Sequence, residues 1–396
     1  MAALAGATGA YGISVAVIYT TTSLFLANAV HAAALEIGLF FAGRGVIAIV
    51  VNLLVGRYSD RLRDRRLLLG YSAAAGALGA LCFAALRGYV AVLVTGAVLF
   101  NLGGVTFSQL FAYVKEFAEA RGHPVTAFGS MMRSVFSAGW VVGPLFGFFL
   151  LNRYGFGPTY VAVAGLFLIT AVASLCGLPR VSDPPRAGST SGMRATRPGR
   201  HTLLLLAAVI VLGVVNRMYG IDIALYVTKD LHLGAAVVGW MAGVAAALEI
   251  PVMITVGRVA DRVGKLRLVI AASLGAAVFF SLLPLVGSVP ALLALQVLNA
   301  AWTAVALSIP MLMVQQEVPG GAGTSSSMYS TAFTTAGLIA GAVTAVTADA
   351  VGFRNVFWVC AGLSVLATGL LAARQHRACR ISRSSGPYQP SRKTGE

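Results

Sequence analysis

Long apolar stretches alternate with short polar breaks along almost the whole chain. A helix must contain about 20 apolar residues to cross the roughly 30 Å hydrocarbon core of a bilayer, and counting stretches of that length gives twelve candidate helices. The predicted spans are 9–30, 36–56, 67–86, 89–112, 126–151, 157–178, 202–225, 235–256, 266–286, 289–313, 324–347 and 353–373. The pattern therefore predicts an all-α integral membrane protein.

One polar break is much longer than the others. It runs from Pro179 to His201 and is rich in Pro, Gly, Ser and Arg, a composition typical of a mobile linker. Six predicted helices lie on each side of it. We therefore expect an N-terminal six-helix bundle at 1–178, a cytoplasmic linker at 179–201 and a C-terminal six-helix bundle at 202–374. The polar, Arg- and Ser-rich residues 375–396 cannot bury apolar surface and are predicted to form a disordered tail.

The basic residues predict the orientation in the membrane. About 22 of the 29 Lys and Arg residues fall after the second, fourth, sixth and eighth spans or in the tail, and only about four fall in the opposite loops. Basic residues are retained on the cytoplasmic side, so we expect both termini in the cytoplasm of a multi-pass protein of the inner (plasma) membrane. The first span has no small-residue cleavage pattern, which favours a retained helix over a signal peptide.

Composition excludes several classes of function. Hydrophobic residues make up 58% and charged residues 11% of the chain, far from the values of soluble domains. The net charge of +16 resides in loops, without a basic face interleaved with aromatics, so no nucleic-acid partner is expected. The four cysteines show no close pairing. Neither paired carboxylates, a nucleophile–base pair nor a phosphate-binding loop occurs, so we expect no enzyme activity, no cofactor and no metal site.

The same polar hinge occurs twice. GRYSDRLRDRR begins at Gly56 and GRVADRVGKLR begins at Gly257, 201 residues later, and Asn101 has a counterpart at Asn299. A repeat at half-chain offset between apolar spans is typical of two-fold membrane transporters. The hinge resembles that of the major facilitator superfamily, and the resemblance implies two six-helix bundles around a central cavity.

The hinges carry candidate conformational residues. Their glycines permit close backbone approach, and their aspartates can meet helix N-termini or neighbouring arginines. The resemblance implies that the hinges latch the cytoplasmic ends of the bundles when the cavity faces outward. The alternative is a solvated basic turn that serves only topology. The predicted gating residues of the two hinges are Gly56, Asp60, Arg61, Gly257, Asp261 and Arg262.

The fifth span contains a third gating candidate, Gly139-x-x-x-Gly143-Pro144. Small residues four positions apart form a flat stripe for close helix packing, and the proline permits a kink. The string resembles the antiporter motif of exporters in the same superfamily, whereas the simpler interpretation is plain helix packing.

Three strings resemble bacterial sugar efflux transporters more closely. They are Gln109 to Leu150, Asn216 to Leu225, and Leu248 to Pro251. This resemblance implies export of sugars or glycosides in exchange for protons, by alternating access of a monomer in the lipid bilayer. A multidrug/proton antiporter of the same superfamily is the first alternative. A non-transporting membrane receptor or scaffold is a second, but it would not need the duplicated hinge.

Polar side chains inside the spans give the candidate substrate site. Arg133, Ser137 and Trp140 share one helix face and offer a cation, a hydroxyl and an indole, which suit the edge and the ring of a sugar. Alternatively, Arg133 extends to the nearby membrane interface. The predicted substrate-binding residues are Arg133, Trp140, Asn101, Asn216, Tyr219, Asp222, Asn299 and Trp302.

Two acidic residues inside the spans are candidates for proton coupling. Glu249 lies just past the middle of the span 235–256, where a carboxylate is costly to keep ionised without a nearby cation. Asp222 lies near the outer end of its span, where a capping or interfacial role is the alternative. A permanent ion pair of Glu249 with Arg133 or Arg217 would instead serve assembly.

Overall fold

The computed structural model describes residues 1–59, 64–180, 199–317 and 322–384, and every regular element in these ranges is helical. Within these residues, twelve helices are long and apolar enough to cross a membrane, which confirms the predicted twelve-helix fold. The first half contains α1 (Ala2–Asn28), α2 (Ala34–Ser59), α3 (Arg65–Ala85), α4 (Tyr89–Ala120), α5 (Val125–Tyr154) and α6 (Phe156–Val172), which continues as the π-helical turn η1 (Ala173–Gly177). The second half contains α7 (Arg200–Leu225) with η2 (Tyr226–Asp230), α8 (Ala235–Val263), α9 (Lys265–Leu282) with the 3₁₀ turn η3 (Leu283–Leu285), α10 (Val289–Glu317), α11 (Ala322–Val351) and α12 (Phe353–Ser384).

Several helices extend beyond the apolar spans that predicted them. Helix α4 continues to Ala120 because the polar residues that follow its apolar part are good helix formers, and Lys115 and Glu119 form an ion pair one turn apart at 3.9 Å. Helix α12 likewise continues to Ser384. Residues 375–384, predicted as part of a disordered tail, are therefore helical, and the remainder of the tail lies outside the described residues.

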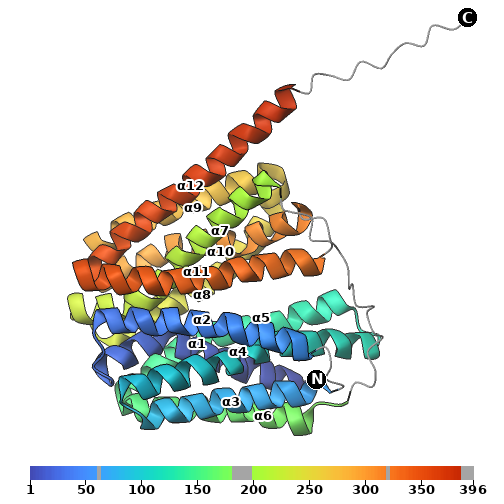
Figure 1. Ribbon diagram of the computed structural model, residues 1–396, viewed down its shortest axis with the longest axis vertical. Coiled ribbons are helices and arrows are strands. Elements are labelled where there is room, and N and C mark those ends of the chain that lie inside the picture. The colour runs from blue at the N-terminus through green and yellow to red at the C-terminus, as the bar shows by residue number, and fades with distance from the viewer. Residues whose placement is uncertain (60–63, 181–198, 318–321, 385–396) are drawn as a thin grey trace, which may run out of the picture.

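The two halves form separate helix groups (Figure 1). Helices α1–α6 occupy the lower part of the view and α7–α12 the upper part. We refer to the end of the bundles at which α1 begins as the terminus end and to the opposite end as the far end. Helix α2 meets α11, α5 meets α8 and α1 meets α7 across the boundary between the groups.

Among the described residues, the two halves make close backbone contacts toward the far end. An added Cβ on Gly38, in the first turns of α2, would lie 2.3 Å from Cα of Ala345 near the end of α11. On the other pair of helices, an added Cβ on Gly239, in the first turns of α8, would lie 3.0 Å from Cβ of Phe148 on α5. Both contacts occur where α2 and α8 begin, so both of these helix pairs pack together at the far end, and we call this end sealed in that sense.

The glycine stripe of α5 faces α1. An added Cβ on Gly139 would lie 2.8 Å from the backbone N of Ile13, and one on Gly143 would lie 2.5 Å from Cβ of Ala16. Since such distances leave no room for a methyl group, these glycines let the two helix backbones approach. Pro144 lies inside α5, where it removes one backbone hydrogen bond.

Candidate functional site

A cavity of about 580 Å³ lies between the two halves, lined by side chains from both. Its first-half walls come from α1, α2, α4, α5 and α6, and its second-half walls from α7, α8, α10 and α11. Among the predicted substrate, coupling and gating residues, those that line it are Trp140, Pro144, Asn216, Tyr219, Glu249 and Asn299. Its volume falls in the range of pockets that bury a small molecule.

Aromatic rings form one wall of the cavity. Tyr19 on α1 contacts Trp140 on α5 with ring centroids 5.4 Å apart, and Tyr11 stacks on Phe136 at 6.0 Å. The indole Nε1–H of Trp140 is buried and has no hydrogen-bond partner among the described residues. An apolar platform with a free N–H donor suits the ring and edge of a carbohydrate.

Two arginines, Arg44 on α2 and Arg217 on α7, also line the cavity. The guanidinium carbon of Arg44 lies 5.7 Å from the centre of the Phe100 ring. That of Arg217 lies 5.5 Å from the Tyr19 ring and 4.8 Å from the Phe333 ring. A cation–π contact stabilises a desolvated cation. It leaves the N–H groups around the guanidinium free to donate hydrogen bonds to another partner.

Glu249 is the acidic residue of the cavity. It lies on α8 and forms neither an ion pair nor a hydrogen bond with any residue of the described ranges. The contacts between α8 and α5 show at which level of the membrane Glu249 lies. Added Cβ atoms on Gly239 and Gly243 would touch Phe148 and Leu145, respectively, in an antiparallel register that brings Glu249 level with the residues just before Trp140. The alternative of an ion pair with Arg133 or Arg217 is therefore wrong for this conformation.

A buried amide network supports one side of the cavity. Asn299 donates to Oε1 of Gln296 at 2.9 Å, and the Tyr219 hydroxyl donates to the same oxygen at 3.3 Å. Trp302 donates from Nε1 to Oδ1 of Asn299 at 3.1 Å and is 1% exposed. Trp302 thus lies behind the cavity wall rather than in it, and it orients Asn299, which does line the cavity.

Two further residues predicted to bind substrate, Arg133 and Asn101, lie outside the cavity. Arg133 is exposed on α5, 5.5 Å from the centre of the Phe111 ring, because it lies about two turns nearer the terminus end than Trp140, beyond the lining. The amide of Asn101 donates to the backbone oxygens of Arg44 and Ala97, so it joins α4 to α2. These two residues have structural contacts in place of the predicted ones.

Asp222 is fully buried and does not line the cavity either. Its Oδ2 accepts a hydrogen bond from Thr344 of α11 at 3.4 Å, and its Oδ1 has no partner among the described residues. Helical spacing groups Asp222 with Tyr219, but α11 covers the part of α7 that carries the aspartate. Asp222 therefore has no path through the cavity in this conformation, which argues against both roles predicted for it.

The hinge residues are only partly within the described structure. Asp60 and Arg61 lie outside the described residues. The surroundings of Gly56 and the side chain of Asp261 are not described either. An added Cβ on Gly257 would meet no atom of a described residue within 4 Å, and Arg262 is exposed. The latch contacts predicted for the hinges remain a prediction.

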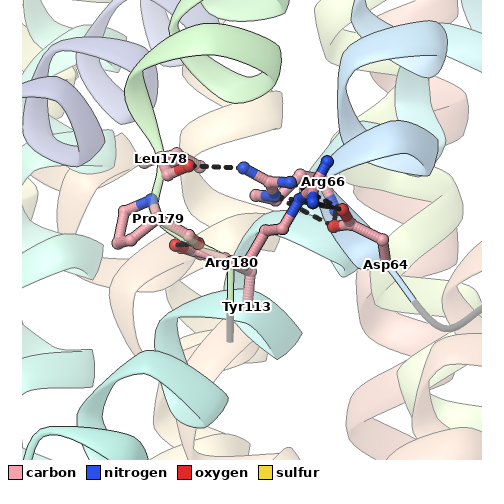
Figure 2. A network of polar contacts seen from close by, with 6 residues as sticks. All are labelled: Asp64, Arg66, Tyr113, Leu178, Pro179 and Arg180. Atoms are coloured by element: carbon pink, nitrogen blue, oxygen red, sulfur yellow. Dashed lines mark hydrogen bonds and ion pairs between the residues drawn. The ribbon is translucent and has the colours of Figure 1, made fainter. Parts of the chain in front are cut away.

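The first hinge ends in a polar network that the sequence did not reveal (Figure 2). Asp64 caps α3 by accepting from the backbone N of Arg66 at 3.1 Å and from its Nη2 at 2.7 Å. Arg66 donates from Nη1 to the oxygen of Leu178 at 2.7 Å, and Tyr113 donates to the oxygen of Pro179 at 2.8 Å. The segment that leaves η1 is thereby held on α3 and α4.

The electrostatics of this network follow from its geometry. The Arg66 side chain hydrogen-bonds the carboxylate of Asp64 and holds its pKa below the ordinary value. Arg180 adds a weaker attraction at 4.0 Å. The sequence feature that could have indicated this network is the second Asp-Arg pair of the first hinge, which has no equivalent in the second hinge.

The repeated halves, the membrane-length helices and the cavity between the halves define a membrane transporter, not an enzyme. Comparison with known proteins identifies which transporters it resembles. The sequence model of the Major Facilitator Superfamily matches residues 4–206 and 205–378. The chain belongs to the major facilitator superfamily and, within it, to the family of sugar efflux transporters.

The relatives cover nearly the whole chain. Sugar efflux transporter A of Dickeya chrysanthemi is 34% identical over 87% of this chain and 88% of its own length. Sugar efflux transporter A of Escherichia coli is 33% identical over 91% and 92%. Among solved structures, the nucleoside transporter NupG has a TM-score of 0.77 at 15% identity over 94% and 98%, which shows the fold alone.

Proposed function

We propose that this protein exports sugars or glycosides by alternating access of its two halves, in exchange for protons. The observation that carries the proposal is the cavity between the repeated halves, sealed at the far end and lined by aromatic rings, amides and one unpaired carboxylate. The names of relatives about one third identical over nine tenths of the chain support the sugar as substrate.

The boundaries of the transporting unit follow the repeat. We propose bundles at 1–178 and 202–374 that rock about the cavity, with both termini in the cytoplasm of the inner membrane. On that orientation the sealed far end faces outward, and the conformation is the one that receives substrate from the cytoplasm. The protein is proposed to work as a monomer.

Glu249 is proposed to carry the coupling proton. An ionised carboxylate in a membrane cavity without a paired cation is costly, whereas a sugar hydroxyl or a proton relieves that cost. Sugar and proton would then compete for one group, which is the condition for exchange. Asp222 is not proposed for this role.

The charges of the cavity disfavour the multidrug alternative. Arg44 and Arg217 outnumber Glu249, so an organic cation would meet net repulsion. A neutral or acceptor-rich ligand fits this lining better.

The test is uptake of labelled glucose, lactose and glycosides into everted vesicles that contain the protein, with and without an imposed proton gradient. Gradient-driven accumulation of a sugar is expected. Accumulation of cationic dyes with no sugar flux would move the function to multidrug export.

A pair of Glu→Gln variants tests the coupling. Glu249→Gln should abolish uphill transport and preserve sugar exchange, because the site remains but the proton carrier is gone. Glu119→Gln is the matched control, since Glu119 is exposed at the end of α4, away from the cavity. Unchanged uphill transport by Glu249→Gln would refute the assignment.

A further inference from the structure

Arg44 and Arg217 reach one cavity from different halves, and their guanidinium groups have no acceptor among the described residues. Neither side chain donates a hydrogen bond or forms an ion pair with any described residue, although both rest on aromatic rings. The buried Nε of Arg217 is without a partner in the same ranges. A charged side chain inside a membrane is costly, so such groups normally face a partner or a ligand.

The contacts of α2 with α11 show at which level along the bundle Arg44 lies. An added Cβ on Gly38 of α2 would touch Ala345, and one on Gly45 would touch Leu338. The two helices therefore run antiparallel in a fixed register. This register brings Arg44 level with the residue that follows Leu338.

The contacts of α7 with α11 show the level of Arg217 in the same way. An added Cβ on Gly213 of α7 would lie 2.8 Å from Cβ of Ala336, and nine residues further on Asp222 accepts from Thr344. These contacts set a parallel register in which Arg217 lies level with residue 339 or 340 of α11. The two arginines thus share one level, to within about one turn.

The charges of the cavity define the ligand that would neutralise it. Arg44, Arg217 and Glu249 sum to one positive charge, so a single monovalent anion makes the loaded cavity neutral. Guanidinium groups present planar forks of N–H donors that match the two oxygens of a carboxylate. A phosphate monoester offers similar oxygens but carries about −1.5 to −2 charges at pH 7, which exceeds the balance.

We propose that Arg44 and Arg217 together bind the carboxylate of an acidic sugar, such as a hexuronate. Its ring would lie against Tyr19 and Trp140, and its hydroxyls would reach Glu249, which keeps the proton exchange described above. Because each half supplies one arginine, the carboxylate would also bridge the halves at this level. The inference rests on the proposed sugar export and narrows its substrate class.

The experiment is competition in proteoliposomes of the full chain. Counterflow of labelled glucose or lactose, whichever the vesicles accumulate faster, is measured against glucuronate, the uncharged methyl ester of glucuronate, and glucose 6-phosphate. Glucuronate should compete about tenfold better than its ester, the difference expected for a charge-assisted hydrogen-bonded pair. The acid and the ester differ in charge but hardly in shape.

Variants assign the preference to the arginines. Arg44→Gln and Arg217→Gln should each reduce the acid-to-ester ratio toward one. Arg153→Gln should retain it, because Arg153 also stands over a ring, that of Tyr154 at 5.9 Å, but does not line the cavity. If a glutamine variant does not support counterflow, the lysine variant replaces it; lysine keeps the charge without the fork and should retain only part of the preference.

Each outcome decides the proposal. Equal competition by acid and ester in the wild-type protein overturns it, as does an undiminished preference in both arginine variants. Stronger competition by glucose 6-phosphate overturns the choice of a carboxylate. Absence of flux for every sugar would instead refute the export function itself, a result distinct from sugar flux without acid preference.

Discussion

Replacing Gly341 with alanine should drive the protein out of the conformation that is sealed at the far end. Helix α11 passes so close to α2 at this point that an added Cβ would lie 2.3 Å from N and 2.8 Å from Cα of Ala42. Ordinary contact requires 3.4–4 Å, so the overlap is about 1 Å. The overlapping atoms belong to the backbone, and no rotamer change relieves them.

The size of the effect follows from the cost of overpacking. Inserting one methyl group into a closely packed contact costs about 1–3 kcal/mol. The overlap exists only while α2 and α11 are packed together, so this cost acts on the conformational equilibrium. We expect the ratio of sealed to open far ends to fall by about 5- to 150-fold.

Spin labels at Leu35 and Val346, both exposed near the far ends of α2 and α11, report the equilibrium as a distance distribution by pulsed electron resonance. The native cysteines are first replaced. Gly341→Ala should shift the distribution to longer distances. Gly337→Ala, one turn away, is the matched control: its Cβ would meet no atom within 4 Å, while its gain in helix propensity is the same. Identical distributions for the two variants would show that the close approach of α2 and α11 does not govern the equilibrium.

Three smaller predictions follow from individual contacts. Asp64→Ala should cost about 1 kcal/mol of unfolding free energy at neutral pH through loss of the α3 cap. The Asp64 carboxylate has a lowered pKa in the folded protein. The extra stability of the wild type over the variant is therefore complete above about pH 4 and disappears as the pH falls through that lowered pKa. Thermal unfolding of both proteins between pH 7 and pH 3 tests this direction. Asp222→Asn should leave gradient-driven sugar uptake intact, because the residue faces Thr344 and not the cavity, and loss of uphill transport alone would restore it as a proton carrier. Trp302→Phe should lower the unfolding free energy by about 1 kcal/mol, because Asn299 loses its donor, and a chemical denaturation series measures it.

The helices could be predicted from the sequence because the bilayer sets their minimum length. Their ends could not, since the signal for a membrane span stops where the apolar residues stop, whereas a helix continues as long as good helix formers follow. This difference accounts for the extra turns of α4 after residue 112 and of α12 after residue 373. It also explains why ten residues of a predicted disordered tail are helical.

The site was only half predictable for a related reason. Helical spacing shows which residues share a face, but not which neighbour covers that face. Helical spacing groups Arg133 with Trp140, yet only Trp140 lines the cavity, and Tyr219 and Asp222 separate in the same way. Arg133 lies about two turns and Asp222 about one turn from a residue that does line the cavity, and their neighbours there are Phe111 of α4 and Thr344 of α11.

The charged residues of the cavity could not be predicted from the internal repeat either. The offset of 201 between the hinges would match Arg44 with Ala245, which lines the cavity from α8, and Glu249 with Ala48 on α2. The two equivalent helices thus carry opposite charges at nearly equivalent depths, a cation in the first half and a carboxylate in the second. Duplication explains the shape of the cavity, but its polarity belongs to each half separately. A ligand that spans the cavity must therefore present an acceptor to α2 and a donor to α8, and a sugar acid does both.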